Sequence, residues 1–421
     1  MLPAIDASLL AGGDPGVKGF EDGTHRLVAP EATLERLQPR LHDAGITRVA
    51  NITGLDRVGI PVALVCRPNS RSLAVSQGKG LTLAAAKASA LMESIETYHA
   101  ERIQSSLRLA SLEELCLEGR IADIQELPRT ERSFYSPAML MLWISGFNLM
   151  GDQTVWVPYD AVHTNYTLEA EAFPGAYCFL RSSNGLASGN HVLEAISHGI
   201  CEVVERDALT LWRLLPPELQ ARRHVDLLTI GDSHCSALLE RFDAAGIVAT
   251  VWETTMDIAI PSFCCTVTER DSGSWRGTLA ASGFGCHPSR EVALLRAMTE
   301  AAQCRVTLIS GARDDISRAD YERFRRLQPA QEEYSAPRTA LKGRPFYPGP
   351  GWRSMTFLDD VRRELALLAS AGIREVVVVD LSREEWGVSV VRVLIPGLEM
   401  GTVPGAIPGR RARRMRPTGQ G

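Results

Sequence analysis

Glutamates stand in pairs three residues apart in two segments that are otherwise rich in apolar residues. Glu93 and Glu96 lie in SALMESIETYHA, and Glu202 and Glu205 lie in ISHGICEVVERDA. At about 100° per residue, a helix would bring Glu194, two turns earlier, to the same side as the second pair. Carboxylates at these spacings repel one another, and a counter-cation relieves the repulsion. The pattern therefore indicates a cation site, for which Mg2+ is the first candidate.

A solvated helix face would also explain these glutamates. The opposite arc of the second segment carries Val192, Leu193, Ile196 and Ile200, as any amphipathic helix would. A solvated face usually mixes Lys and Arg among its acids, however, and here the one nearby base is Arg206, displaced to one side. A single helix leaves the two explanations balanced, whereas two such helices favour a site.

Length, charge and hydropathy narrow the class of protein. The 421 residues exceed the usual size of a single core, so we expect two domains or one large α/β unit. The net charge of −5 and the pI near 6.0 argue against bulk nucleic-acid binding. No run reaches the roughly eighteen apolar residues of a membrane helix, and the first residues do not show the basic region followed by an apolar run that is typical of a signal peptide. We expect a cytoplasmic protein without nucleic-acid or membrane partners.

The nine cysteines follow no CxxC spacing, which argues against a disulfide framework and against a zinc site. We interpret most of them as reduced thiols of the core, and their spacing nominates none as a sulfur relay. The one basic cluster, at 410–416, is interpreted as a solvated or partner-facing tail rather than a nucleic-acid site.

Apolar periodicity predicts a mixed α/β fold. A hairpin is expected at 144–160, around the Gly151-Asp152 turn, and a charged surface insertion or lid at 313–350. Three other helices are predicted: one at 31–44 that Pro30 opens, one at 290–309, and one in FLDDVRRELALLASAG that Gly372 ends. The other predicted strands are 60–66, IVATVWET, IPSFCCTVTE, TLAASGFGC, EVVVVDL and VSVVRVLIPG.

A glycine-rich segment precedes each acidic helix. SQGKG precedes the first and SSNGLASGN the second, and we interpret both as turns whose backbone N–H groups suit a phosphate. The Walker pattern fails, because Gly80, followed by Leu81, stands where Ser or Thr is required. A glycine turn followed by ExxE thus occurs twice, which suggests an internal duplication around a shared central cleft.

The predicted helix at 290–309 adds a cation and an amide to this set. Arg296, Glu300 and Gln303 share one of its faces by the same angular count. Mg2+ prefers a few carboxylates together with water and phosphate oxygens, which matches glutamates spread over two helices. The residues therefore favour ATP or a similar nucleotide held through metal ions outside the Walker fold.

Three blocks of the sequence resemble the nucleotide-site blocks of the YcaO family. They are SQGKGLTLAAAKASALMESIETYHAE, RSSNGLASGNHVLEAISHGICEVVERDAL and GFGCHPSREVALLRAMTEAAQCR, and VVRVLIPGLE resembles the family's C-terminal strand. The resemblance implies a YcaO-type fold and an ATP- and Mg2+-dependent enzyme that phosphorylates a peptide-bond oxygen, after which a nucleophile displaces the phosphate. We expect a leader with a first helix and strands at 1–66, the catalytic domain at 67–399 and a Pro/Gly/Arg-rich tail at 400–421.

The resemblance also implies roles for single residues, carried over position by position. The implied Mg2+ ligands are Glu93, Glu96, Glu194, Glu202 and Glu205. The implied contacts to nucleotide are Ser89, Ser188, Asn190, Arg296, Glu300 and Gln303. By their position, Ser76 and Lys79 either contact phosphate or are turn residues only, and the two hypotheses are equally weighted. The groups implied in catalysis are Glu202, Glu205 and Arg206.

The segment ahead of the first block, GTHRLVAPEATLERLQPRL, resembles the stand-alone members of the family that are encoded with TfuA-type partners. This implies formation of a thioamide in a peptide or protein. The expected partners are a TfuA-like protein and a sulfur donor, and a homodimer is also expected. Formation of an azoline from Cys, Ser or Thr of the substrate is a competing hypothesis, although the basic tail departs from the proline-rich end of many such members. Two non-catalytic hypotheses remain open, a nucleotide-binding accessory protein for sulfur insertion and a metal-binding scaffold.

Overall fold

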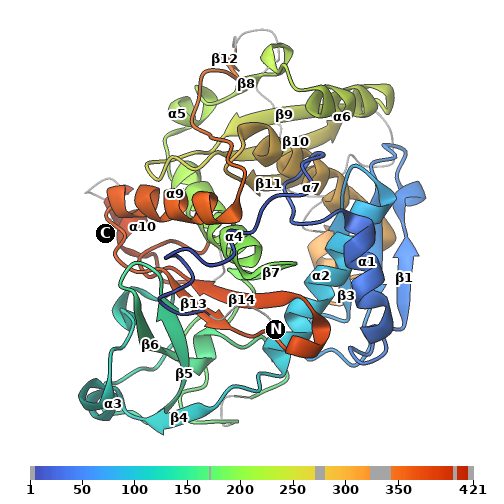
Figure 1. Cartoon of the computed structure of the whole chain (residues 1–421). Helices are drawn as coiled ribbons and strands as arrows, with labels where there is room; N and C mark the ends of the chain where they lie inside the picture. The colour runs from blue at the N-terminus through green and yellow to red at the C-terminus, as the bar shows by residue number, and fades with distance from the viewer. Residues whose placement is uncertain (1–4, 170–171, 271–279, 323–342, 402–404, 416–421) are drawn as a thin grey trace.

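The computed structural model describes residues 5–169, 172–270, 280–322, 343–401 and 405–415. It has the mixed α/β fold that the apolar periodicity predicts (Figure 1). The helices are α1 (Pro30–Leu37), α2 (Leu83–Glu101), α3 (Leu112–Glu118), α4 (Val192–Arg213), α5 (Pro217–Ala221), α6 (Ser233–Ala244), α7 (Arg290–Ser310), α9 (Phe357–Ser370) and α10 (Arg410–Met415).

The strands form several sheets rather than one. The largest has the order β4-β5-β13-β14-β7, with β6 also paired to β5, and two antiparallel sheets have the orders β1-β2-β3 and β11-β10-β9. The strands are β1 (Arg48–Asn51), β2 (Val62–Cys66), β3 (Val75–Lys79), β4 (Leu107–Ala110), β5 (Met141–Asn148), β6 (Gln153–Pro158), β7 (Leu186–Gly189), β8 (Val225–Asp226), β9 (Ile247–Glu253), β10 (Ser262–Glu269), β11 (Ala281–Cys286), β12 (Arg344–Pro345), β13 (Val377–Asp380) and β14 (Ser389–Leu394).

Three long helices, α2, α4 and α7, lie among these sheets in the middle of the molecule (Figure 1). Each packs against a strand that precedes it in the chain: α2 on β3, α4 on β7, and α7 on β11. The predicted apolar arc of α4, which includes Val192, Leu193, Ile196 and Ile200, is buried in the core beside β14. Because this arc faces the sheet, the glutamates of α4 are held toward the other two helices.

Glycines allow two of these helices to lie directly on their strands. A Cβ at Gly78 of β3 would lie 2.1 Å from the backbone nitrogen of Ala90 and 2.3 Å from the carbonyl oxygen of Ala86, both on α2. A Cβ at Gly283 of β11 would lie 2.1 Å from the backbone nitrogen of Ala301 on α7. Real Cβ contacts are longer than this, so both positions require glycine for close packing.

The prediction that SQGKG forms a turn is therefore wrong. Ser76 to Lys79 belong to strand β3, which pairs antiparallel with β2, and 186–189 of the second glycine-rich segment form β7. Local sequence favours a turn at Gly78, but the contact with α2 makes the same glycine part of a strand. A glycine-containing strand followed by a helix packed on it occurs three times, at β3-α2, β7-α4 and β11-α7. The predicted internal duplication stays a prediction.

Of the basic cluster near the C-terminus, Arg410, Arg413 and Arg414 are exposed, as expected of a solvated tail, whereas Arg411 is docked on the rest of the protein. Arg411 of α10 forms ion pairs with Asp207, at 2.9 Å, and with Asp257. The Glu399 carboxylate accepts a hydrogen bond from the Gly409 backbone N–H, which ties the start of α10 to the core. Arg411 is therefore neutralised by a buried aspartate and anchors α10, while the exposed arginines beside it stay consistent with a solvated or partner-facing tail.

The remaining predictions can be compared only where residues are described. The hairpin, the long helix at 290–310, helix α9 and strands β9 to β11 and β13 to β14 are confirmed. The helix expected at 31–44 is α1, which is shorter. The insertion expected at 313–350 lies largely outside the described residues, and the nine cysteines are free, six of them buried. No described helix combines the length and apolarity needed to cross a membrane.

Replacing Gly78 with Ala should destabilise the protein, because the new Cβ would collide with the backbone of α2 rather than with a movable side chain. We expect a loss of about 3 kcal/mol or more in the free energy of unfolding, measured by urea denaturation. Gly54→Ala is the matched control, since a Cβ there meets nothing within 4 Å. Equal stability of the two variants would contradict the packing role.

Candidate functional site

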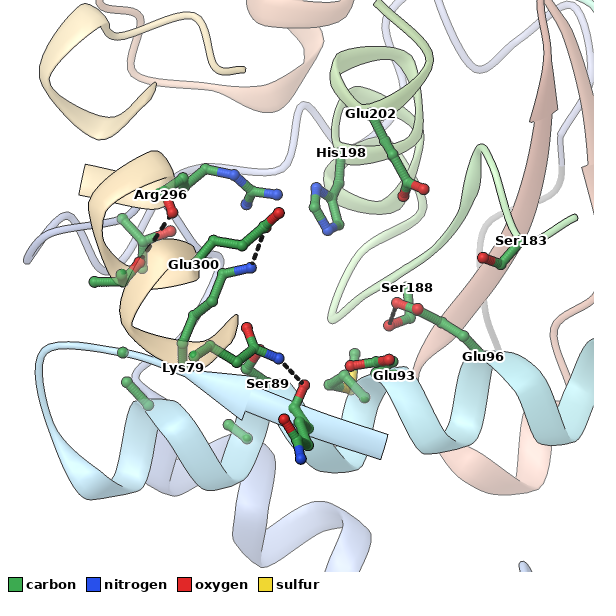
Figure 2. Close-up of a pocket in the computed structure, with 18 of the residues that line it drawn as sticks. Lys79, Ser89, Glu93, Glu96, Ser183, Ser188, His198, Glu202, Arg296 and Glu300 are labelled. Carbon is green, nitrogen blue, oxygen red and sulfur yellow. Dashed lines mark hydrogen bonds and ion pairs between the residues drawn. The ribbon is translucent and has the colours of Figure 1, made fainter. Parts of the chain in front are cut away.

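A cavity of about 960 Å3 lies between α2, α4 and α7, with strand β3 and the N-terminal segment 20–33 contributing to its wall (Figure 2). The structure brings almost all of the predicted site residues into this wall, although they come from three distant parts of the chain. They are Lys79, Ser89, Glu93, Glu96, Ser188, Asn190, Glu194, Glu202, Glu205, Arg206, Arg296, Glu300 and Gln303.

Ser76 is the exception among the predicted site residues. It is buried and does not line the cavity. The residues of β3 that do line it are Val75, Gln77 and Lys79. Successive side chains of a strand point to opposite faces, so Ser76 belongs to the face turned away from the cavity. A contact of Ser76 with a bound phosphate is therefore not supported by its position.

The glutamates are crowded and shielded from water. Burial, together with the charge of Glu202 on the facing helix, raises the pKa of Glu93 to about 7 and that of Glu96 to about 8. Burial also raises the pKa of Glu205 to about 7 and raises the pKa of Glu202. Some of these side chains are consequently protonated near neutral pH unless a cation compensates them.

The arrangement of carboxylates suits a cation that takes part of its coordination from elsewhere. Among the described residues, no three Asp, Glu, His or Cys side chains converge closely enough to hold a metal ion by themselves. The glutamates instead stand on facing helices, and their oxygens are the hard ligands that Mg2+ accepts together with water and phosphate oxygens. The donor set therefore fits Mg2+ that arrives with a phosphate ligand.

Cations balance the glutamates from the side of β3 and α7. The Lys79 ammonium forms an ion pair of 2.6 Å with Glu300, and despite burial this keeps the pKa of Glu300 below its usual range. The Arg296 Nε atom is buried and has no hydrogen-bond partner among the described residues. Figure 2 shows Lys79, Glu300 and Arg296 together on one side of the cavity. This side is suited to receive anionic phosphate oxygens.

Hydroxyl and amide groups complete the wall. Ser188 Oγ donates a hydrogen bond of 2.6 Å to Glu96 Oε1, which joins β7 to α2 across the cavity. The Gln303 side-chain amide donates to the carbonyl oxygen of Gln77 at 3.0 Å, and its Oε1 has no partner in the described part of the chain. Polar atoms of this kind, held in place but not fully paired, can contact a bound ligand.

The N-terminal segment contributes residues that the sequence did not single out. Arg26 Nη1 lies 3.3 Å from Glu194 Oε1, and the second oxygen of Glu194 accepts backbone N–H groups. Thr33 exchanges hydrogen bonds with the Asn190 side chain, and Arg36 donates to its Oδ1 at 2.9 Å. Arg26 precedes α1 and Arg36 lies within it, but no local pattern connects them with partners 168 and 154 positions later.

His198 is a second residue of the wall without a predicted role. It follows Glu194 by one helical turn, and Figure 2 shows it beside Glu202. Burial lowers the pKa of its imidazole well below the usual value, and nearby Arg296 lowers it further. A neutral imidazole among the carboxylates adds no charge of its own and can accept or donate a hydrogen bond.

Comparisons with known proteins agree with this geometry. The family model described as YcaO cyclodehydratase, ATP- and Mg2+-binding, matches residues 77–399. A protein of Rhizobium leguminosarum bv. trifolii, described as an uncharacterized protein in the tfuA 3' region, is 36% identical over 410 residues, which are 95% of this chain and 95% of that protein.

Solved structures share the fold at low sequence identity. A heterocyclase in complex with substrate and cofactor matches with a TM-score of 0.75 and 24% identity. The match covers 95% of this chain but 55% of the heterocyclase chain. The YcaO protein of Methanopyrus kandleri, bound with AMPPCP and Mg2+, matches with a TM-score of 0.70 and 22% identity over 94% of this chain and 100% of that one. At these identities the likeness establishes the fold.

Replacing Glu96 with Gln should stabilise the protein without ligands at alkaline pH. The folded state holds a proton on Glu96 up to about pH 8, whereas the unfolded state releases it near pH 4.5, so the wild type loses stability as pH rises between these values. We expect Glu96→Gln to be more stable by about 1–3 kcal/mol at pH 8, with the difference vanishing toward pH 4.5.

Thermal unfolding of both proteins from pH 4.5 to 8.5, without divalent cations, measures this difference. Glu35→Gln on the exposed face of α1 is the control and should show no such trend. A Glu96→Gln protein that is less stable than the wild type at pH 8 would contradict the raised pKa.

Proposed function

This chain belongs to the YcaO family, and we propose that it converts a backbone amide of a peptide or protein into a thioamide. The family binds ATP and Mg2+. The convergence of acidic side chains from α2 and α4 with Lys79 and Arg296 in one cavity carries the assignment to ATP-dependent phosphoryl transfer. The Rhizobium relative, which is described by its place beside tfuA, supports a thioamide as the product and a TfuA-like protein as the partner.

The proposed reaction balances with hydrosulfide as the sulfur source. The amide oxygen attacks the γ-phosphorus of ATP, ADP leaves with the electron pair of the broken P–O bond, and the amide nitrogen loses its proton. Hydrosulfide then adds to the amide carbon, its proton passes from sulfur to nitrogen, and the C=S bond forms as the C–O bond breaks and inorganic phosphate departs with the electron pair. The products are a thioamide, ADP and phosphate, and no redox partner is required.

The residues of the cavity have distinct tasks in this proposal. Glu93, Glu96, Glu202 and Glu205 would hold Mg2+, which on binding supplies positive charge to the phosphate oxygens. Arg296 and Lys79 face the same oxygens from α7 and β3, and Lys79 would exchange its contact with Glu300 for one with phosphate. Phosphoryl transfer depends mainly on positioning and charge neutralisation, so no nucleophilic side chain is needed.

Azoline formation is a second candidate, because the family model carries the description cyclodehydratase. The phosphorylation step is the same, but a Cys, Ser or Thr side chain of the substrate attacks instead of an external sulfur. The two products differ in mass, since the thioamide replaces one oxygen by sulfur and the azoline loses one water. A homodimer stays a prediction.

The proposal is tested by mass spectrometry of a candidate peptide incubated with the protein, ATP, Mg2+, sulfide and a TfuA-like partner. We expect a mass gain equal to exchange of oxygen for sulfur, together with release of ADP and phosphate. A loss of one water instead would establish the azoline reaction. Absence of phosphate release from folded protein that still binds ATP would favour the non-catalytic accessory protein.

Glu202→Gln and Glu205→Gln should each reduce peptide-dependent phosphate release by about 100-fold or more, because each removes a negative charge that helps to hold Mg2+. Glu364→Gln is the matched control. Glu364 is also a buried glutamate with a pKa raised to about 8 by burial, but it lies on α9 outside the cavity, where Ser197 and Cys201 donate to it. Normal turnover by a folded Glu202→Gln protein would overturn the assignment.

A further inference from the structure

Among the described residues, His198 is the one histidine that lines the cavity. It lies on α4, four residues after Glu194 and four residues before Glu202, so about one helical turn separates it from each of them. The three side chains therefore share the face of α4 that is turned to the cavity. Figure 2 shows the His198 ring pointing into the cavity, between Arg296 of α7 and Glu202.

His198 has no structural task that the described residues reveal. No hydrogen bond or ion pair joins it to any of them. The polar groups behind α4 are satisfied without it, because Ser197 and Cys201 both donate to Glu364 of α9. The His198 side chain is half-buried, and its ring nitrogens are open to the cavity rather than enclosed by protein atoms. A ligand in the cavity can therefore reach them.

The buried histidines of the described chain are different. Each of them is held by a contact of its Nδ1 atom: His25 with Lys18, His99 with the carbonyl oxygen of Ile95, His163 with the Asn165 backbone N–H, and His191 with the Leu193 backbone N–H. A polar ring that is withdrawn from water costs free energy unless it is paired. His198 lacks this compensation within the described protein, which indicates a partner that enters the cavity.

The position of His198 limits what this partner can be. Mg2+ prefers oxygen ligands to an imidazole nitrogen, so His198 is poorly suited to hold the metal itself. An imidazole carries at least one N–H whether it is neutral or protonated, so it can donate a hydrogen bond in either state. The ring needs an acceptor that lies between Arg296 and the metal-binding glutamates. Phosphate oxygens are the acceptors that the proposed reaction places there.

A histidine is better suited to this place than a lysine or an arginine. A permanent cation one turn from both Glu194 and Glu202 would form ion pairs with these carboxylates and compete with Mg2+ for them. An imidazole donates its hydrogen bond without requiring a positive charge. It can therefore contact an anionic ligand and leave the carboxylates available to the metal.

We propose that His198 is a phosphate-binding residue whose ring N–H donates a hydrogen bond to a non-bridging oxygen of the β- or γ-phosphate of ATP. This inference rests on the proposed function, because it gives one more residue of the same cavity a place in nucleotide binding. His198 supplies a donor on the stretch of wall between Arg296 and Glu202. It binds and orients the phosphate chain, and it transfers no proton during the reaction.

Binding is measured by calorimetric titration of AMPPCP into the full chain at saturating Mg2+. We expect about tenfold or more weaker binding by His198→Leu, which has no donor, and an affinity within about threefold of the wild type for His198→Gln, which restores an N–H. His224→Leu is the matched control and should bind normally. His224 is also half-buried, and its Nδ1 has no partner in the described chain, but it does not line the cavity.

Titration of AMP under the same conditions separates phosphate contacts from contacts to the nucleoside. AMP lacks the β- and γ-phosphates, so His198→Leu should bind it as tightly as the wild type does. An equal loss of affinity for AMP and AMPPCP would show that His198 contacts another part of the nucleotide, and the inference would be wrong. A defect in AMPPCP binding that disappears when the Mg2+ concentration is raised would also contradict it, because His198 would then act on the metal.

Kinetics and stability separate this role from a catalytic and from a structural one. His198→Leu should raise the KM for ATP about tenfold or more and leave the KM for peptide unchanged. Its melting temperature without ligands should equal or exceed that of the wild type, because an unpaired polar group is gone. A lower melting temperature with unchanged affinity for AMPPCP would identify His198 as structural. Normal AMPPCP binding by His198→Gln without phosphate release would instead make it a proton-transfer group.

The outcomes distinguish this inference from the proposed function. Weaker AMPPCP binding by His198→Leu, together with no thioamide formation by the wild type, would support the phosphate contact and overturn the reaction. Thioamide formation by the wild type, with equal AMPPCP affinity in His198→Leu, would do the reverse. If His198→Leu does not fold, His198→Ala removes the same donor and provides the same comparison with His198→Gln.

Discussion

The repulsion between carboxylates held in one poorly hydrated cavity is the constraint on which the rest of the structure depends. Glu93 and Glu96 of α2 face Glu202 and Glu205 of α4, and burial raises the pKa of all four. Such a cluster lowers stability when it is ionised and empty, so the surrounding fold must hold the helices together regardless. The same cluster becomes favourable when a divalent cation and an anionic ligand enter together.

The force that holds the helices against this repulsion comes from their opposite faces. The apolar arc of α4 is buried against β14, and α2 and α7 lie so close to their strands that Gly78 and Gly283 have no room for a Cβ. Close contact of this kind fixes the position of a helix along and across its strand. The glutamates are therefore positioned by the packing behind their helices, not by attraction among the carboxylates themselves.

The sequence predicted the parts of this site that depend on local periodicity. Each glutamate pair lies on one face of a helix, as do Arg296 and Gln303. Such a face can be predicted from the spacing of neighbouring residues in the sequence. Glycine is compatible with a turn and with a strand, so the local sequence from Ser76 to Lys79 wrongly predicts a turn. Only the close contact of Gly78 with the distant Ala90 shows that the segment is a strand. The place of Arg26 at the site could not be predicted for a related reason, because its partner Glu194 lies in another part of the chain.

Arg392 shows a second limit of sequence reasoning. In the sequence it is a single polar residue in an apolar strand, and only the structure distinguishes it from Arg67 and Arg290, whose carboxylate partners are in place. The Arg392 guanidinium donates to the carbonyl oxygen of Ala161, and its remaining nitrogens have no hydrogen-bond partner among the described residues. Such an environment results from tertiary packing of distant segments, which the periodicity of neighbouring residues cannot predict.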